Sequence, residues 1–132
     1  MPKIVKGNVV SGTGVGSCFT GKDWVENQIR EKLGFVPHPG TLNLVLGERT
    51  TRRYQSFIED REGISIEPLD DSHSWGKCFK VRINGRVNGA VVIPLVPNYP
   101  RDLVEIIAPV NLREFFGLED GSDVTIAIHD SD

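Results

Sequence analysis

The sequence predicts one mainly β domain with short helices, folded as a closed or nearly closed β-barrel whose ends the helices cover. Three observations predict this fold. The chain of 132 residues is long enough for one hydrophobic core but not for two, so residues 1–132 are expected to form a single domain. Six or seven segments have the alternating or β-branched pattern of strands. These segments do not alternate regularly with helices, which argues against a parallel sheet built from βαβ units.

The expected strands lie along the whole chain. Asn84-Gly85, between two apolar runs, is the strongest short signal for a tight β-hairpin. The expected strand ranges are 4–10, 41–46, 64–66, 78–83, 87–93, 103–108 and 124–128. The remainder of the polar segment 48–71 is expected to form surface structure.

Two helices are expected. The first covers residues 20–33, with Thr20 as a candidate N-cap and Gly34 as a candidate C-cap. Its apolar residues lie four apart on one stripe: Val25, Ile29 and Leu33. The second helix covers residues 112–116, and Asn111 and Gly117 have the residue types that begin and end a helix.

Composition and charge favour a soluble cytoplasmic protein. The net charge of −3 and the scattered basic residues argue against nucleic acid as the main partner. No apolar stretch is long enough for a membrane span, and the first residues do not resemble a signal peptide. The two cysteines, Cys18 and Cys78, form no CxxC pair and are expected to fill apolar space in a reducing compartment.

A glycine-rich loop follows the first expected strand. Its residues are Gly12, Thr13, Gly14, Val15, Gly16 and Ser17. Without Cβ atoms, such a loop can curl so that successive backbone N–H groups meet phosphate oxygens. The same glycines can equally form a turn at the rim of a barrel. Their spacing matches neither the GxGxxG dinucleotide motif nor the P-loop.

Thr41 and Asn43 form a second candidate site. In a strand, residues two apart point to the same face. A hydroxyl and an amide oxygen are hard ligands suited to Mg²⁺, which usually completes its shell with phosphates and water. The alternative is that the two residues belong to the exposed polar face of a half-buried strand.

The third candidate region lies near the C-terminus. Glu105 interrupts an apolar strand, and its carboxylate points either outward to water or into a pocket that binds a substrate. The segment Val110-Asn111-Leu112-Arg113 leads into the second helix, whose first N–H groups are free to bind an acceptor. Arg113 is either a contact to a phosphate or base edge, or a surface arginine.

These features, taken in order, resemble the archaeal CTP-dependent riboflavin kinases. The resemblance is carried by the strand, the GxGxG loop and the helix, and then by LGFVPHPGTLNL, GAVVIP and EIIAPVNLREFFGLEDGSDVTI. It spans nearly the whole chain and is loosest over residues 48–75. It implies a six-stranded cradle-loop (RIFT-type) β-barrel, related to the barrels of swapped-hairpin transcription factors.

The resemblance also implies the roles of the candidate residues. Residues 12–17 would line the phosphates and ribose of CTP, and Val110, Asn111, Leu112 and Arg113 would hold the nucleotide, chiefly at its cytosine end. Thr41 and Asn43 match the Mg²⁺ ligands of the family, and Glu105 matches a glutamate that contacts the flavin.

One position departs from the family pattern. Where the family commonly has a threonine that touches the flavin, this chain has Pro97, which offers neither a hydroxyl nor a backbone N–H. Asn98 and Tyr99 are the candidates to replace that contact.

The implied activity is transfer of the γ-phosphate of CTP to the 5′-hydroxyl of riboflavin, giving FMN and CDP, with Mg²⁺ as cofactor. The partners would then be small molecules, with neither nucleic acid nor membrane involved. No histidine stands out as a general base, and no catalytic residue is assigned. Two alternatives remain open: a non-catalytic barrel that serves as a regulatory or DNA-binding module, and a kinase of the same fold with another acceptor.

Overall fold

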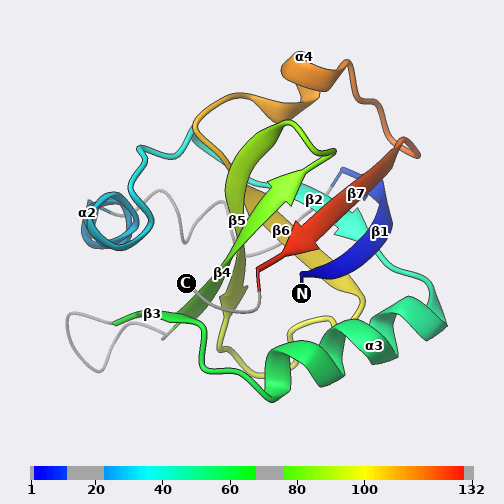
Figure 1. The fold of residues 1–132 in the computed structure, drawn as a ribbon, viewed down its shortest axis with the longest axis horizontal. Coiled ribbons are helices and arrows are strands. Elements are labelled where there is room, and N and C mark those ends of the chain that lie inside the picture. Colours follow the sequence, from blue (N-terminus) through cyan, green and yellow to red (C-terminus); the bar gives the residue numbers. More distant parts are fainter. Residues whose placement is uncertain (1, 12–22, 68–75, 130–132) are drawn as a thin grey trace.

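The computed structural model describes residues 2–11, 23–67 and 76–129 of the chain. Figure 1 shows its strands wound into a barrel, with helices set around it. The elements in chain order are β1 (Lys3–Val10), α2 (Asp23–Leu33), β2 (Leu42–Val45), α3 (Glu48–Glu59), β3 (Ile64–Ile66), β4 (Gly76–Ile83), β5 (Val87–Pro94), β6 (Leu103–Ile107), α4 (Leu112–Phe116) and β7 (Asp123–Ile128). Every expected strand is present, with ends that differ by at most two residues from the predicted ones.

The barrel consists of six antiparallel strands. The order along the sheet is β3-β4-β5-β6-β2-β1-β7, and a further pairing between β4 and β7 closes it. That pairing uses the last part of β4, where Arg82 lies opposite Ala127. The first part of β4 pairs instead with the extra strand β3, which lies outside the closed ring. The predicted barrel is therefore confirmed.

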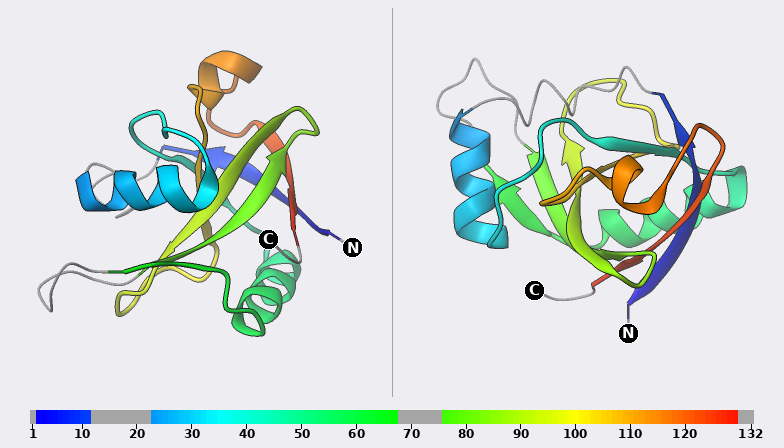
Figure 2. Two further views of the ribbon diagram at one scale, coloured as in Figure 1. Left: turned by 60° about the vertical axis from the view of Figure 1, so that its left-hand side comes forward. Right: turned by 90° about the horizontal axis from the view of Figure 1, so that it is seen from above.

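The hydrophobic core fills the interior of the barrel. Burial alternates along β1. Val5, Val9 and the residue midway between them are buried, and the residues on either side of that one are exposed, as the two-residue period of a strand requires. A second apolar cluster lies between α2 and the outside of the barrel, where Val25 and Ile29 pack with Cys78. Figure 2 shows α2 beside the barrel wall. Because it is covered on both faces, β5 is buried at every position but one.

Helix α3 was missed by the sequence analysis, which expected only polar surface structure there apart from the strand at 64–66. That strand is confirmed as β3, but residues 48–59 form a helix of twelve residues. The buried residues Tyr54 and Ile58 lie four apart, as on one face of a helix, so the helical period is present in the sequence but is carried by few apolar residues. Both side chains belong to the barrel core, and α3 covers one end of the barrel (Figure 1).

The residues predicted to form turns and helix ends do so where the structure describes them. Asn84 and Gly85 have positive φ angles of 49° and 69°, as a type I′ hairpin requires. Gly34 ends α2 with a φ of 87°. Helix α2 begins at Asp23 in the described part of the chain, and the candidate cap Thr20 lies outside it. None of the described helices is long and apolar enough to span a membrane.

Cys78 is fully buried, as expected, and desolvation by this burial raises the pKa of its thiol to about 12. A thiol in such surroundings stays protonated and fills space. The other cysteine, Cys18, lies outside the described residues.

Candidate functional site

Strands β2 and β6 place Asn43 directly opposite Glu105. Both side chains are buried, with exposed fractions of 7% and 0%. The hydroxyl of Thr41, just before β2, lies 3.0 Å from Asn43 Oδ1 and 3.1 Å from Glu105 Oε1. Thr41 and Asn43 therefore point to the same side, as predicted. The alternative of an exposed polar face is wrong for Asn43, and an outward-pointing Glu105 is excluded, because β2 and β6 bury both side chains.

Tyr99 contacts the other oxygen of the same carboxylate. Its hydroxyl donates a short hydrogen bond to Glu105 Oε2. The pKa of Tyr99 is raised well above its ordinary value, first by burial and then by this hydrogen bond and by the negative charge of Glu105. Pro97 and Asn98, the other two candidates in this loop, are exposed. Of the three, Tyr99 is the one that brings a hydroxyl to Glu105.

Glu105 is thus a buried carboxylate held by hydroxyl groups. The charge of Glu105 also affects the buried Tyr54 of α3. The pKa of Tyr54 is raised mainly by burial and additionally by the negative charge of Glu105. Burying a carboxylate is costly unless hydrogen bonds or an opposite charge compensate for the lost water. The contacts with Thr41 and Tyr99 provide part of this compensation.

The spacing of the Thr41 and Asn43 oxygens fits a magnesium ion. Neighbouring ligands of an octahedral Mg²⁺, each about 2.0–2.1 Å from the ion, lie about 2.8–3.0 Å apart. The distance between Thr41 Oγ1 and Asn43 Oδ1 is 3.0 Å. Among the described residues, no group of three or more His, Cys, Asp or Glu residues is arranged to hold a metal. The candidate ligands at this place are the neutral oxygens of Thr41 and Asn43.

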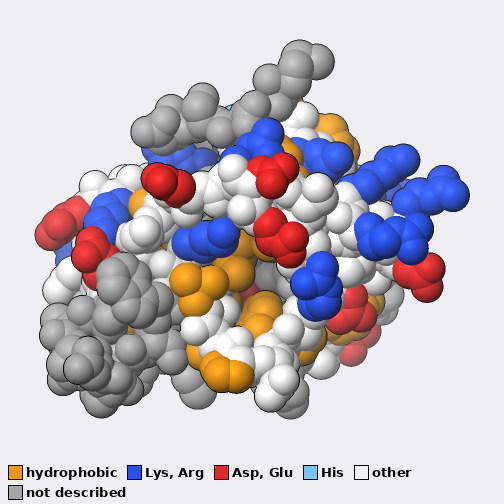
Figure 3. Space-filling view, turned by 90° about the horizontal axis from the view of Figure 1, so that it is seen from below, with side chains coloured by type: hydrophobic (Ala, Val, Ile, Leu, Met, Phe, Trp, Pro, Cys, Tyr) orange, Lys and Arg blue, Asp and Glu red, His pale blue; other side chains and the backbone are white. Residues whose placement is uncertain are grey.

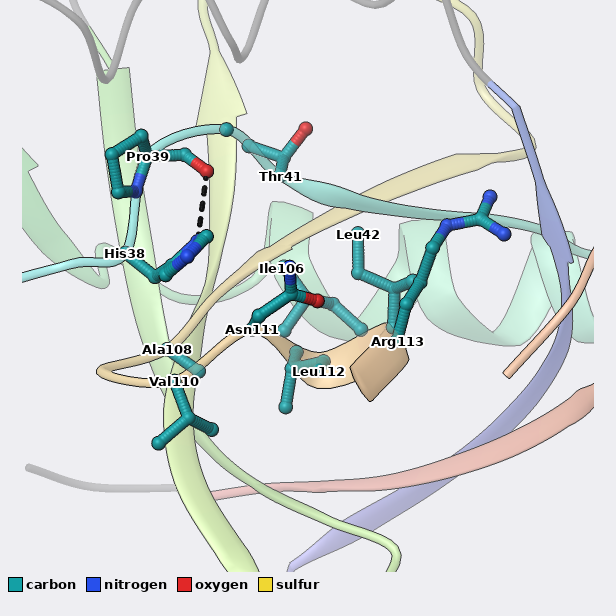
Figure 4. Close-up of a pocket in the computed structure, with 11 residues that line it drawn as sticks. His38, Pro39, Thr41, Leu42, Ile106, Ala108, Val110, Asn111, Leu112 and Arg113 are labelled. Carbon is teal, nitrogen blue, oxygen red and sulfur yellow. Dashed lines mark hydrogen bonds between the residues drawn. The ribbon is translucent and has the colours of Figure 1, made fainter. Parts of the chain in front are cut away.

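A pocket of about 170 Å³ opens next to this cluster. Figure 4 shows Thr41 on one side of it and the residues at the start of α4 on the other. Its lining consists of His38, Pro39, Gly40, Thr41, Leu42, Ile106, Ala108, Val110, Asn111, Leu112 and Arg113. The fold therefore brings the candidate metal ligand Thr41 and all four candidate residues of segment 110–113 to one pocket, although about 70 residues separate them in the chain.

Arg113 links this pocket to the start of the glycine-rich loop. Its guanidinium donates a hydrogen bond of 2.9 Å to Asp120 Oδ1, and the Ser11 hydroxyl donates to the same carboxylate at 2.8–2.9 Å. The hydrogen bonds from Arg113 and then Ser11 hold the pKa of Asp120 below its usual value. Gly12, Thr13, Gly14, Val15, Gly16 and Ser17 lie outside the described residues. Ser11, the residue before them, is therefore tied to the rim of the pocket.

Comparison with known proteins gives the family of this chain. A family model, CTP-dep_RFKase (domain of unknown function DUF120), matches residues 9–128. The chain belongs to this family of CTP-dependent riboflavin kinases.

Curated relatives named riboflavin kinase occur in several archaea. The chain is 40% identical to one from Archaeoglobus fulgidus over 94% of its own length and 54% of the relative. It is 36% identical to one from Ignicoccus hospitalis, covering 97% of this chain and 72% of the relative, and 34% identical to one from Saccharolobus solfataricus, covering 95% and 73%. The chain therefore spans little more than half the length of some of these relatives.

In this member of the riboflavin kinase family, the start of α4 is partly occupied by its own cap. The Asn111 side chain accepts a hydrogen bond of 3.1 Å from the backbone N–H of Glu114, which confirms Asn111 as the N-cap. One of the N–H groups expected to be free for a ligand is thereby used. All four residues of segment 110–113 line the pocket.

His38 is a pocket residue that the sequence analysis did not select, because its neighbours are prolines. Its backbone N–H donates to the Ala108 carbonyl at 2.8 Å, which fixes the segment before Thr41 to the end of β6. Its ring Nδ1 lies 3.1 Å from the Pro39 carbonyl, an acceptor, so Nδ1 carries the proton in this contact. The signal in the sequence was its position three residues before Thr41.

A second hollow lies along α3 on another face of the molecule. It is lined by Lys3, Arg52, Arg53, Ser56, Phe57, Asp60 and Arg61. Figure 3 shows that basic side chains on this face are interspersed with acidic ones. Arg52 pairs with Glu48, and the Arg61 guanidinium lies over the Phe57 ring. This pattern is typical of a solvated helix face rather than of a continuous basic surface.

Proposed function

We propose that this domain is a CTP-dependent riboflavin kinase, which transfers the γ-phosphate of CTP to the ribityl 5′-hydroxyl of riboflavin and releases FMN and CDP. The observation that supports it best is the convergence at one pocket of Thr41 with segment 110–113. Family membership supports the same conclusion. A site for phosphoryl transfer needs a metal position and a nucleotide position side by side, and the nearness of the two candidate positions supports the proposal.

On the nucleotide side, we assign CTP to segment 110–113 and to loop 12–17. Arg113 is the one Lys or Arg side chain among the described residues of the pocket lining, and its guanidinium can donate to phosphate or to a base edge. Ser11 and Asp120 support this assignment because they connect the root of the loop with Arg113.

On the metal side, Thr41 and Asn43 would hold Mg²⁺ through their side-chain oxygens. Bound there, the ion would neutralise charge on the phosphates of CTP. Because both ligands are neutral, the nucleotide would complete the shell and bring most of the negative charge that the ion requires.

On the acceptor side, we assign riboflavin to the neighbourhood of Glu105 and the loop 97–99. Pro97 cannot supply the hydroxyl that the family pattern implies, whereas the Tyr99 hydroxyl lies at the Glu105 carboxylate. Tyr99 is accordingly the residue of this loop proposed to replace that contact.

Catalysis would come mainly from positioning and from neutralisation of charge. Phosphoryl transfer proceeds through a loose transition state, so the protein contributes little covalent chemistry. Holding the acceptor hydroxyl in line with the γ-phosphate removes much of the entropic barrier.

One experiment tests the proposal against its alternatives. The protein is incubated with riboflavin, Mg²⁺ and each of CTP, ATP, GTP and UTP, and FMN is measured. FMN with CTP alone is the expected result. A CTP-induced thermal shift without FMN from any nucleotide would indicate another acceptor. Neither FMN nor a thermal shift would indicate a non-catalytic binding module.

A further inference from the structure

The hydroxyl of Thr41 has one proton and two acceptors. Its oxygen lies within hydrogen-bond distance of Asn43 Oδ1 at 3.0 Å and of Glu105 Oε1 at 3.1 Å. A threonine hydroxyl can donate only one full hydrogen bond at a time. The proton therefore points toward either the amide or the carboxylate.

The two orientations of the hydroxyl proton differ in which oxygen lone pairs they leave free to bind a cation. With the proton directed at Asn43, the hydrogen bond occupies the space between the two oxygens and one lone pair of the amide. With the proton directed at Glu105, the lone pairs of Thr41 Oγ1 and Asn43 Oδ1 are both available at a spacing of 3.0 Å. Only the second orientation suits a cation held by both oxygens.

Glu105 favours the second orientation. A carboxylate is a stronger acceptor than a neutral amide, and its hydrogen bonds are roughly twice as strong. Glu105 is fully buried, so no solvent competes for its oxygens. Its charge also lies directly behind a pair of neutral ligands, where it increases the electron density on the Thr41 oxygen.

Tyr99 holds the carboxylate from its other side. Its hydroxyl donates to Glu105 Oε2, which leaves Oε1 to face Thr41. The contacts thus form a series that runs from Tyr99 through Glu105 and Thr41 to Asn43 and ends at the candidate metal position. Asn43 and Glu105 are also fixed relative to each other by the β2–β6 register.

Resting on the proposed function, we infer that Glu105 is a positioning residue of the metal site. It accepts the hydrogen bond of the Thr41 hydroxyl, so that Thr41 and Asn43 present their lone pairs to a divalent cation. Tyr99 orients Glu105 for this contact. This role is additional to the place of Glu105 on the proposed riboflavin side. It also supplies a negative charge next to a ligand pair that has none.

The test measures metal affinity rather than turnover. Binding of Mn²⁺ to protein saturated with CDP is followed by the electron paramagnetic resonance signal of free Mn²⁺ and compared with binding to CDP alone. The expected effect of Glu105→Gln is about a tenfold loss of Mn²⁺ affinity, the lower end of the range for partners of metal ligands. Tyr99→Phe leaves the carboxylate charged and is expected to cost less, about two- to fivefold. Glu62→Gln, an exposed position with the same change in charge, should bind Mn²⁺ like the unmodified protein.

A double-mutant cycle distinguishes action through Thr41 from an effect of charge alone. In a Thr41→Val background there is no hydroxyl proton to direct, so Glu105→Gln should cause little further loss of Mn²⁺ affinity. An equal loss in both backgrounds would overturn the inference, as would unchanged Mn²⁺ affinity in Glu105→Gln. Far-UV circular dichroism of each variant checks that the barrel is folded.

Riboflavin affinity provides the second readout. Because Glu105 also lies on the proposed riboflavin side, riboflavin binding is measured separately, in metal-free protein, by quenching of flavin fluorescence, and the loss of Mn²⁺ affinity in Glu105→Gln should be the same with and without riboflavin. A large loss of riboflavin affinity with normal Mn²⁺ affinity would show a flavin contact instead and would overturn the inference. If Thr41→Val and Asn43→Ala both bind Mn²⁺ as the unmodified protein does, the proposed metal site itself is wrong, which is a different result from a failure confined to Glu105.

Discussion

The Thr41 hydroxyl lies 3.1 Å from the Glu105 carboxylate, although 64 positions separate the two residues in the chain. The antiparallel pairing of β2 with β6 creates this contact. It joins the residue proposed to bind metal to the residue proposed to lie on the riboflavin side. The two halves of the candidate site are therefore connected by a direct hydrogen bond, and a change in one is expected to affect the other.

Replacing Asn43 should abolish most of the turnover and leave the fold intact. Asn43→Ala removes one of two candidate metal oxygens, and we expect the rate of FMN formation at saturating CTP to fall about 100-fold, as when one group that stabilises transition-state charge is removed. The free energy of unfolding should fall by only about 1 kcal/mol, because one hydrogen bond and little volume are lost. Asn88→Ala, at an exposed position of β5, is the control. Near-normal turnover of Asn43→Ala at saturating Mg²⁺ would contradict the ligand assignment.

Replacing Asp120 should weaken nucleotide binding without a comparable effect on the chemical step. Asp120→Asn removes the charge that holds Arg113 at the pocket and accepts from Ser11. We expect the KM for CTP to rise about three- to tenfold, with kcat changed less than twofold, as for loss of an interaction that acts on binding. Steady-state kinetics with varied CTP measures both. Asp60→Asn, at the end of α3, serves as the control.

The contact of Asp120 with Arg113 and Ser11 also predicts how the affinity for CTP depends on pH. Hydrogen bonds from Arg113 and then Ser11 lower the pKa of Asp120, so its contribution is complete above the ordinary carboxylate pKa of about 4 and is lost as the pH falls through the lower folded value. The difference in CTP affinity between the unmodified protein and Asp120→Asn should therefore be constant from about pH 8 to pH 5. A difference that disappears already near pH 6 would mean that another group controls it.

The two tyrosines should resist ionisation while the protein is folded. Tyr54 and Tyr99 are the only tyrosines in the chain, and burial, with help from Glu105, raises the pKa of both above the ordinary value of about 10. Below about pH 10 both are neutral whether the chain is folded or not. Above it the unfolded chain loses these protons first, so stability falls as the pH rises toward the folded pKa values.

Absorbance at 295 nm, which reports tyrosinate, measures the ionisation of the two tyrosines. In an alkaline titration it should rise together with the loss of far-UV circular dichroism, not in a separate step near pH 10. An early rise of about half the full amplitude would show that one tyrosine is accessible in the folded protein.

Gly89 should tolerate no side chain. A Cβ at this position of β5 would lie 2.3 Å from the Ile107 carbonyl oxygen of the neighbouring β6. Gly89→Ala therefore forces the two strands apart, and we expect it to lower the free energy of unfolding by about 2 kcal/mol or more in urea denaturation. Gly47→Ala is the matched control, since its Cβ would meet nothing within 4 Å and its φ of −69° suits alanine. Equal stability of the two variants would contradict the close approach.

Much of the fold could be predicted from the sequence because its signals are local. The alternation of β1, the Asn84-Gly85 turn and the Asn111 cap each depend on residues a few positions apart. Helix α3 also has a local signal, with Tyr54 and Ile58 four residues apart, but its many polar residues make the segment resemble surface structure. Its stability depends on packing Tyr54 and Ile58 into a barrel formed by distant strands.

For the candidate site, the sequence by itself determined which residue types are present and that Thr41 and Asn43 point the same way, since the period of a strand settles that. Only the tertiary structure decided that Glu105 faces inward, that Tyr99 rather than Pro97 brings a hydroxyl to it, and that Arg113 is tied to Ser11. The reason is physical: the direction of a side chain follows from its neighbours along one strand, whereas its partners follow from strand pairing and closure of the barrel, which join segments far apart in the chain.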